Sequence, residues 1–264
     1  MALNPPLSSF KGKNIWIIGA SSGIGQACAK LFFEKGAHLY LSARRSDALL
    51  DLQNNLNRSA AAHQECHVLT LDVTDEHSIN LATHTILEQW SEIDVLLFVS
   101  GIYKPIRADQ FDFKSAQEII NTNLLGPMRT LSELLPQFLK QGHGHIALVS
   151  SVAGYSGLPK SLVYGPSKAA LINFAESLYY DLKPKGIAVH LISPGFVETP
   201  ATAKNNFKMP ALISASDAAK EICKGLEQGD FDIHFPKRFT RFLKFLRILP
   251  YPIYFWILKT FIRI

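Results

Sequence analysis

The sequence predicts an α/β fold in which about seven parallel strands form one doubly wound sheet with helices on both faces. Short apolar runs alternate with segments of helical periodicity along most of the chain. The runs are apolar throughout, which is typical of strands that are covered on both faces. The chain has 264 residues, of which 47% are hydrophobic and 19% charged, so one domain can bury a large core.

The elements follow one another in a regular order. The expected strands lie at 14–18, 37–42, 67–71, 95–99, 145–150, 188–192 and 231–235. The expected helices lie at about 23–35, 47–58, 75–90, 114–141, 161–183 and 215–228. A doubly wound sheet binds its ligands at the carboxyl ends of the strands, so the segments after the strands are the candidate site.

The charge of the chain is unevenly distributed. We expect one domain over residues 1–236 and a basic, aromatic-rich tail over 237–264. The formal net charge is +5, but the tail alone holds seven cations and no acid. The rest of the chain has 20 cations against 22 acids, which argues against a nucleic-acid binder.

Cysteines and histidines give no sign of a disulfide scaffold or a metal site. Cys28, Cys66 and Cys223 are few and scattered. His143 and His145 have no acidic or cysteine neighbour, so we expect a turn and no metal there. Residues 1–13 contain two prolines and no apolar stretch of a signal peptide. We therefore expect reduced thiols and a cytoplasmic protein.

The segment 194–214 has no strong periodicity and contains Pro194, Gly195, Pro200 and Pro210. It is longer than an ordinary connection between elements. We interpret it as a mobile lid over the active site.

A glycine-rich turn follows the first expected strand and opens the first helix. It consists of Gly19, Ala20, Ser21, Ser22, Gly23, Ile24 and Gly25. Glycines allow a tight turn and a close approach of the backbone to a pyrophosphate, and the helix N-terminus supplies free N–H groups. The turn therefore predicts a phosphate-binding cradle, although a glycine turn that only packs strand against helix is the alternative.

The second expected strand ends next to Arg44 and Arg45, and no acid occurs before Asp47. An NAD site usually has an acid here for the ribose 2′-hydroxyl, whereas arginine suits a 2′-phosphate. Two adjacent guanidiniums can bind a phosphate through paired hydrogen bonds. We predict NADP(H) as the preferred cofactor, with NAD(H) as the alternative.

Tyr164 and Lys168 are four residues apart, so they share one face of the expected helix. A nearby ammonium lowers the pKa of a phenol, which lets tyrosine donate or accept a proton near neutral pH. Pro166 is tolerated because it falls in the first turn, where its missing N–H costs no hydrogen bond.

Several short motifs occur in one order on this alternation of strands and helices. They are the glycine turn, Asp72-Val73, Asn123-Leu-Leu-Gly126, Ser150-Ser151, Tyr164 with Lys168, and Pro194-Gly195-Phe-Val197-Glu-Thr199. Over roughly residues 10–236 the sequence resembles the short-chain dehydrogenase/reductase family. The resemblance implies a Rossmann-type fold and hydride transfer between a nicotinamide cofactor and a carbonyl or alcohol.

The resemblance also implies a catalytic tetrad of Asn123, Ser151, Tyr164 and Lys168. Ser151 matches better than Ser150, because its 13-residue separation from Tyr164 is that of the family. In the implied chemistry, Ser151 stabilises the developing alkoxide and Tyr164 supplies the proton. Lys168 lowers the pKa of Tyr164 and holds the nicotinamide ribose, and Asn123 positions a water that relays protons to Lys168.

Further cofactor contacts are implied by the same resemblance. Asp72 and Val73 would meet the adenine. The turn from Pro194 through Gly195 and Val197 to Thr199 would meet the nicotinamide. Arg44 falls where NADPH-using members carry their basic residue, and Ala43 where NAD-using members carry the acid.

One motif departs from the family pattern. Members usually have an Asn-Asn-Ala-Gly-like run after the fourth strand, but this chain has Phe98, Val99, Ser100 and Gly101. Side-chain amides that would steady the strand end are therefore missing. Ser100 and Gly101 can still border the cofactor through their backbone groups.

The tail has the pattern of a basic amphipathic helix. Its cations recur at 238, 241, 244 and 247, and its apolar complement is Phe239, Phe242, Leu243, Phe245, Leu246 and Leu249. Such a helix lies in the interface of an anionic membrane. The apolar run 253–258 is much shorter than the ~20 residues that cross a bilayer. The alternatives are that the tail covers the substrate cleft or a partner subunit, or binds nucleic acid.

The leading hypothesis is an NADPH-dependent reductase of a ketone, which we expect to be hydrophobic or lipid-like. Alternatives are an NAD-linked alcohol dehydrogenase, and a membrane-associated cofactor-binding scaffold without catalysis. Tyr179 and Tyr180 lie on the helix that pairs with a partner subunit in the resembled family, so a homodimer or homotetramer is expected, with simple core packing as the alternative. Peripheral attachment to the cytoplasmic face of a membrane is the location that the tail suggests.

Overall fold

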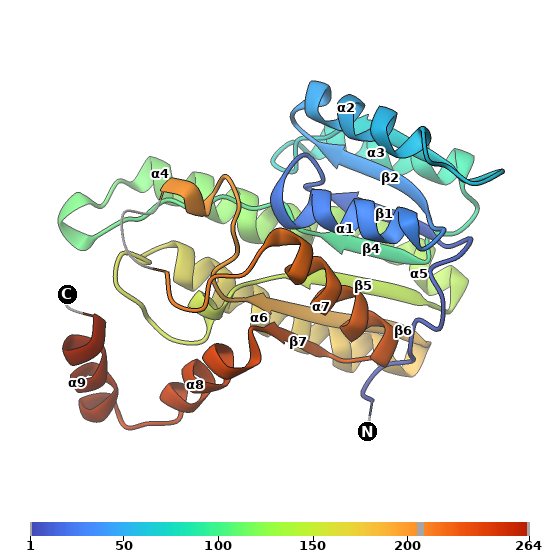
Figure 1. Ribbon diagram of the computed structural model, residues 1–264. Helices are drawn as coiled ribbons and strands as arrows, with labels where there is room; N and C mark the ends of the chain where they lie inside the picture. The colour runs from blue at the N-terminus through green and yellow to red at the C-terminus, as the bar shows by residue number, and fades with distance from the viewer. Residues whose placement is uncertain (1, 205–208, 263–264) are drawn as a thin grey trace.

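The computed structural model describes residues 2–204 and 209–262, and its centre is a seven-stranded parallel sheet (Figure 1). The strands lie in the order β3-β2-β1-β4-β5-β6-β7. They are β1 (Asn14–Ile18), β2 (His38–Ala43), β3 (Cys66–Thr70), β4 (Val95–Phe98), β5 (Gly144–Val149), β6 (Ile187–Pro194) and β7 (Asp232–Phe235). This sheet confirms the predicted fold class, with strand ends that differ from expectation by one or two residues.

The side chains of β1 show why both faces of the sheet are covered. Ile15 and Ile17 belong to one buried cluster, whereas Trp16 and Ile18 belong to another. The first cluster lies under α1 (Gly23–Glu34), α2 (Ser46–Asn57) and α7 (Ala215–Gln228), and the second under α3 (Glu76–Gln89), α5 (Gly126–Gln141) and α6 (Tyr164–Leu182). Figure 1 shows α1 and α7 in front of the sheet and α6 behind it. Because successive side chains of a strand point to opposite faces, apolar residues at every position require this double cover.

The strand order places a switch point between β1 and β4. From β1 the chain adds β2 and β3 on one side, and then continues with β4 to β7 on the other. At their carboxyl ends, Ile18 of β1 pairs with Ser42 of β2 and with Phe98 of β4. The turns that follow these three strands therefore leave from one edge, and their divergence opens a crevice there.

The expected helix over 114–141 was wrong as a single element. The structure has α4 (Phe113–Ile120), a π-helical turn (Asn121–Leu125) and then α5. Pro127 has no N–H to donate to the carbonyl of Asn123, four residues earlier, so the α-helical ladder cannot continue there. Gly126 instead donates its N–H to the Asn121 carbonyl, five residues back. A π-turn of this kind is frequent at functional sites.

The segment interpreted as a lid begins inside β6 and runs to the start of α7. Val197 and Ile213 pair in an isolated parallel bridge, which ties the two ends of the segment together. Residues 205–208, in its middle, lie outside the described residues. Short 3-10 turns occur at Thr202–Lys204, and elsewhere at Ala108–Gln110, Val152–Gly154 and Lys183–Lys185.

The tail forms two helices that follow β7 directly. They are α8 (Lys237–Arg247) and α9 (Tyr251–Ile262), and the second was not expected from the sequence. Leu246, Tyr254 and Leu258 form a buried cluster, and Leu158 of the main domain packs against it. The tail thus covers part of its own domain, which was one of the expected alternatives. No helix in the ranges 2–204 and 209–262 is long and apolar enough to cross a membrane.

Tyr179 and Tyr180 on α6 have different surroundings. The Tyr179 hydroxyl donates to the Leu3 carbonyl and its ring packs against Phe231, so it contacts its own chain. Tyr180 is 77% exposed. Oligomerisation stays a prediction, and Tyr180 is the residue of this pair that is free to support it.

His143 and His145 lie in different surroundings and do not face a common site. His143 lies at the surface near Glu92, whereas His145 is buried on β5, where its Nδ1 lies 3.0 Å from the Nε2 of His190. Within the described ranges, no three His, Cys, Asp or Glu side chains are grouped as a metal site would require.

Candidate active site

Three positions of the turn after β1 require glycine. Gly19 has φ +97°, and a Cβ there would lie 2.6 Å from the backbone nitrogen of Ser100. A Cβ on Gly25 would lie 2.3 Å from the Gly19 carbonyl oxygen. Gly23 has φ +58°, and its Cβ would meet the Thr199 methyl group at 2.8 Å. The helix start, the end of β4 and the loop after β6 therefore meet closely around this turn.

The N-terminus of α1 has the properties of an anion site. Ser22 is the N-cap residue, but its side chain makes no capping hydrogen bond. The first turn of α1 contains no acidic side chain. Its backbone N–H groups and the positive end of the helix dipole are therefore available to a phosphate.

Two arginines and an acid lie beside this turn. Arg45 donates from Nη2 to the Ser21 hydroxyl at 3.0 Å. Arg44 is exposed after β2, and its positive charge acts on Asp72. Burial would raise the pKa of the Asp72 carboxyl, but hydrogen bonds from Thr74 together with Arg44 hold it below its usual value. Asp72 is thus ionised at neutral pH and restrained at the end of β3.

Backbone hydrogen bonds hold the end of β4, where amide side chains are missing. The N–H groups of Val99 and Ser100 both donate to the Ile18 carbonyl, at 2.8 and 3.0 Å. Gly101 follows, and a Cβ there would lie 3.2 Å from the Asn123 Oδ1 and 3.4 Å from the Lys168 Nζ. The end of β4 is therefore attached to β1 although this chain lacks the asparagines that are usual in the family.

Asn123 is buried in the π-helical turn and holds the segment after β4. Its Oδ1 accepts from the Ile102 N–H at 2.8 Å, and its Nδ2 donates to the Ile102 carbonyl at 3.0 Å. The same Nδ2 donates to the Ser167 hydroxyl at 3.2 Å. One amide side chain thus connects the turn after β4 with the start of α6.

Lys168 carries a buried ammonium group. Its residue is only 4% exposed, and its Nζ donates to the Val149 carbonyl at 2.8 Å. Burial disfavours the charged form and lowers the pKa of Lys168 to about 8. Nζ lies 5.9 Å from the centre of the Tyr164 ring, as expected for residues one helical turn apart.

Tyr164 is the first residue of α6, and its surroundings act on its pKa in opposite directions. Burial raises the pKa of the phenol above its usual value and outweighs a hydrogen bond with the Ser151 side chain, which acts to lower it. The net shift is therefore opposite to the lowering expected from Lys168. The Tyr103 ring packs edge-on against Tyr164 with centroids 5.0 Å apart. Neighbouring Ser150 donates to the Lys168 carbonyl at 2.8 Å, so its hydroxyl supports α6 while that of Ser151 faces Tyr164.

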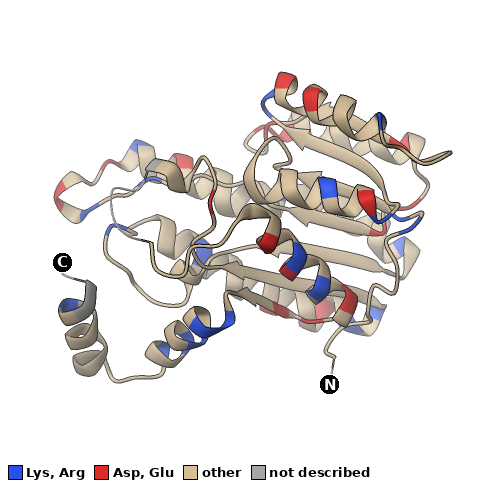
Figure 2. Ribbon diagram, viewed as in Figure 1, with Lys and Arg blue, Asp and Glu red and all other residues tan. Residues whose placement is uncertain are grey.

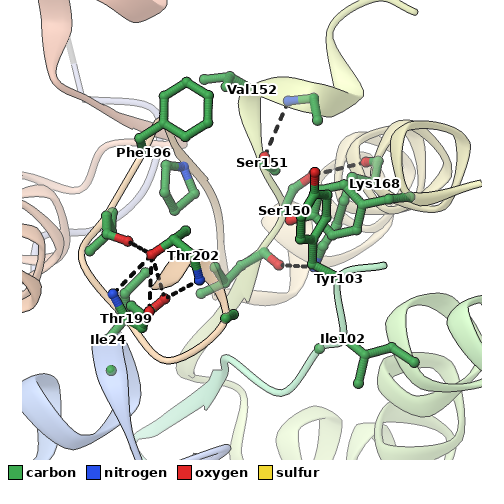
Figure 3. A pocket seen from close by; sticks show the side chains of 18 of the residues that line it. Ile24, Ile102, Tyr103, Ser150, Ser151, Val152, Lys168, Phe196, Thr199 and Thr202 are labelled. Atoms are coloured by element: carbon green, nitrogen blue, oxygen red, sulfur yellow. Dashed lines mark hydrogen bonds between the residues drawn. The ribbon is translucent and has the colours of Figure 1, made fainter. Parts of the chain in front are cut away.

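Most of these groups surround one cavity of about 1050 Å³. Figure 3 shows Ser151, Lys168 and Tyr103 on one side of it and Thr199 and Thr202 on the other. Of the predicted site residues, the structure places on its wall Gly19, Ser21, Ser22, Gly23, Ile24, Arg44, Arg45, Asp72, Val73, Ser100, Gly101, Ser151, Tyr164, Lys168, Pro194, Gly195, Val197 and Thr199. Gly25 and Asn123 lie behind the wall, where they support the glycine turn and Ile102 respectively.

Part of this wall was not predicted from the sequence. Among the residues not predicted are Tyr103, Arg107, Leu158, Phe239, Phe242, Leu243, Leu246, Ile257 and Leu258. Helical periodicity had identified the apolar residues of the first tail helix, but it could not tell what their face contacts. No pattern in the sequence singled out Tyr103 or Arg107.

A glycine cradle at the switch point of a doubly wound sheet is the dinucleotide site of Rossmann-type enzymes, and we assign the protein to that class. Within it, the chain belongs to the short chain dehydrogenase family, whose model matches residues 13–210. An uncharacterized oxidoreductase of Myxococcus xanthus is 33% identical over 238 residues, which are 90% of this chain and 93% of the relative. The protein is therefore an NAD(P)-dependent oxidoreductase.

Solved structures have the same fold. A short-chain dehydrogenase from Sphingobium yanoikuyae in complex with NADPH aligns with a TM-score of 0.78 at 23% identity, over 85% of this chain and 88% of that one. A short chain dehydrogenase/reductase from Burkholderia phymatum in complex with NAD gives a TM-score of 0.75 at 22% identity, over 89% and 93%.

Gly25→Ala is expected to weaken binding of a nicotinamide nucleotide by at least about tenfold, because the added methyl group forces the start of α1 away from Gly19. The dissociation constant is measured by fluorescence titration. Gly157→Ala is the matched control, since its methyl group would meet no atom within 4 Å. Equal affinity in both variants and the parent would contradict the geometry of this cradle.

Proposed function

We propose that the protein is an NADPH-dependent reductase that converts the carbonyl group of a hydrophobic ketone to an alcohol. The observation that supports this proposal most directly is that Ser151, Tyr164 and Lys168 line the same cavity as the glycine turn. A proton donor, an oxyanion stabiliser and a nucleotide cradle thus share one space. Binding alone would require no tyrosine paired with a buried lysine.

The proposed cofactor fits the residues present. Glycines allow the tight packing of the cradle, where a Cβ would clash with neighbouring protein atoms, and the uncapped start of α1 supplies N–H donors for a pyrophosphate. Arg44 and Arg45 supply charge for a 2′-phosphate, and Ala43 leaves no acid to repel it. The nicotinamide cofactor supplies the hydride when it is bound.

The chain's own residues handle the proton. Ser151 donates a hydrogen bond to the ketone oxygen, which stabilises the negative charge that develops there. Tyr164 transfers its phenolic proton to that oxygen. The Lys168 ammonium stabilises the resulting phenolate and holds the nicotinamide ribose. Asn123 fixes the segment around Ile102 and positions the water through which protons reach Lys168.

Homodimer or homotetramer formation is also proposed, with the exposed Tyr180 on α6 as its support. Attachment to an anionic membrane surface through the basic, aromatic-rich tail 237–264 is proposed as well.

Tyr164→Phe is expected to reduce kcat by at least about a hundredfold, because the proton donor is lost while the cavity keeps its shape. Binding of NADPH should be unchanged. Turnover is followed by NADPH absorbance with a panel of hydrophobic ketones, and Tyr180→Phe, at an exposed position of α6, is the control. Undiminished turnover in Tyr164→Phe would overturn the mechanism. Nucleotide binding without any turnover in the parent would favour the scaffold alternative.

Arg44→Ala is expected to reduce the preference for NADPH over NADH by about tenfold to a hundredfold, the worth of a charge-assisted hydrogen bond to phosphate. The ratio of kcat/KM for the two cofactors measures it. Arg58→Ala removes an exposed cation just beyond α2 and serves as the control. A parent enzyme that prefers NADH would support the NAD-linked alcohol dehydrogenase instead.

Ketone reduction is expected to slow as the pH rises through about 8, where Lys168 loses its proton. A neutral lysine no longer stabilises the phenolate that forms when Tyr164 donates its proton, so the loss occurs on the alkaline side. The pH profile of kcat/KM is the measurement. Lys168→Arg keeps its charge at higher pH and should move the decline upward. The same alkaline limb in both enzymes would show that another group is responsible.

A further inference from the structure

The two tail helices have an inner and an outer apolar face. On the inner face, Leu246, Tyr254 and Leu258 are buried. The Tyr254 hydroxyl donates to the Gly157 carbonyl, and the Lys244 ammonium pairs with Asp232 of β7. These contacts fix α8 and α9 to the domain, so the opposite face is held outward.

The outer face exposes an unusual amount of apolar surface. Of the sixteen large hydrophobic residues that are exposed in the described chain, seven lie in the tail. They are Phe242 (51%), Phe245 (52%), Ile248 (76%), Tyr251 (75%), Ile253 (47%), Phe255 (59%) and Trp256 (63%). A concentration of exposed aromatic side chains of this kind marks an interaction surface. Aromatic side chains are also the residues that seat proteins at the headgroup level of a bilayer.

Charge complementarity selects the occupant of this surface. The tail contains no acid, and Figure 2 shows the cations of α8 along the helix. Arg238, Arg241 and Arg247 are exposed, and no ion pair between described residues involves them. Two copies of this tail that met face to face would bring like charges together. An anionic bilayer instead offers phosphates to the arginines and apolar depth to the aromatic side chains.

The same helices form a wall of the cavity. Phe239, Phe242, Leu243 and Leu246 of α8 and Ile257 and Leu258 of α9 line it. Phe242 both lines the cavity and is half exposed, so the cavity wall is continuous with the outer face. A molecule dissolved in the outer part of a bilayer would therefore reach the cavity without crossing water.

We propose that α8 and α9 seat the enzyme on an anionic phospholipid surface and that its substrate enters the cavity directly from the bilayer. The entry route rests on the proposed reductase function, whereas seating on the membrane does not. The substrate class is then a ketone with a long apolar chain. Such a substrate partitions into membranes and fits a cavity that the apolar side chains of α8 and α9 wall.

Membrane seating is tested by sedimentation with phosphatidylcholine vesicles, with and without phosphatidylserine. The parent protein should sediment with the anionic vesicles. The triple variant Ile248→Ser/Phe255→Ser/Trp256→Ser, which alters no residue of the cavity wall, should lose binding by more than about tenfold. The triple variant Leu50→Ser/Leu81→Ser/Leu139→Ser removes as many exposed apolar side chains elsewhere and should bind like the parent.

The charge component has its own variant. Arg238→Gln/Arg241→Gln/Arg247→Gln should reduce binding to anionic vesicles by about a hundredfold. Lys30→Gln/Lys140→Gln/Lys224→Gln, which neutralises three exposed cations outside the tail, should reduce it much less. Absence of sedimentation by the parent, or equal sedimentation of the parent and both tail variants, would overturn the proposal. Dissociation of a parent oligomer by the serine variant, without vesicle binding, would assign the face to a second copy.

Substrate entry is tested with two ketones in the presence of NADPH. Anionic vesicles should accelerate reduction of a long-chain ketone by the parent but not by the serine variant of the tail. A small water-soluble ketone should be reduced equally by both, which also shows that the variant is folded. Vesicle binding without reduction of any ketone would reject the reductase function and leave the seating intact. Reduction of the long-chain ketone that vesicles do not affect in the parent would reject the entry route alone.

Discussion

Burial of the central strands on both faces is the constraint on which the rest of this structure depends. β1 sends Ile15 and Ile17 to one helical layer and Trp16 and Ile18 to the other, so neither face of the sheet can accept a polar ligand. Ligand-binding groups must therefore gather at the carboxyl edge, where strand order reverses next to β1. At that edge, close backbone approaches such as Gly25 to Gly19 bring a helix start, a strand end and a loop to one point. The cavity lies between these three segments.

The chemistry of the site comes from placing an ammonium where water is scarce. Lys168 gives up much of its solvation, which lowers its pKa to about 8, and donates one hydrogen bond to the Val149 carbonyl. Burial raises the pKa of the neighbouring Tyr164 phenol, so this group is protonated at neutral pH. In the proposed reaction the protonated Lys168 offsets this rise, because its positive charge stabilises the phenolate that forms when Tyr164 gives up its proton. Asn123, in a π-turn that Pro127 helps to impose, holds the adjoining segment in place.

The tail links this chemistry to the surroundings of the enzyme. Its inner face completes the cavity wall with apolar side chains, and its outer face presents aromatic and cationic residues to the outside. Anchoring by Lys244 on Asp232 and by Tyr254 on Gly157 keeps the two faces in a constant orientation. The two short helices therefore form both a cavity wall and an exposed surface. A substitution on one face affects the other face only at a residue, such as Phe242, that belongs to both.

The local sequence pattern was enough to determine the order of the elements, the glycine turn and the pairing of Tyr164 with Lys168. Each of these depends on a property of a few neighbouring residues, namely strand burial, left-handed backbone and helical spacing respectively. The family resemblance added Asn123 and Ser151, and the structure brings Ser151 to Tyr164 and puts Asn123 one layer behind the cavity. Only the tertiary structure decided how α8 and α9 fold back, that Leu246 and Leu258 face the cavity, and that Tyr103 stands against Tyr164. The physical reason is that an apolar side chain is driven out of water equally well by a membrane, a partner or its own domain. Which of these it meets depends on contacts between residues far apart in the chain, and no local pattern records them.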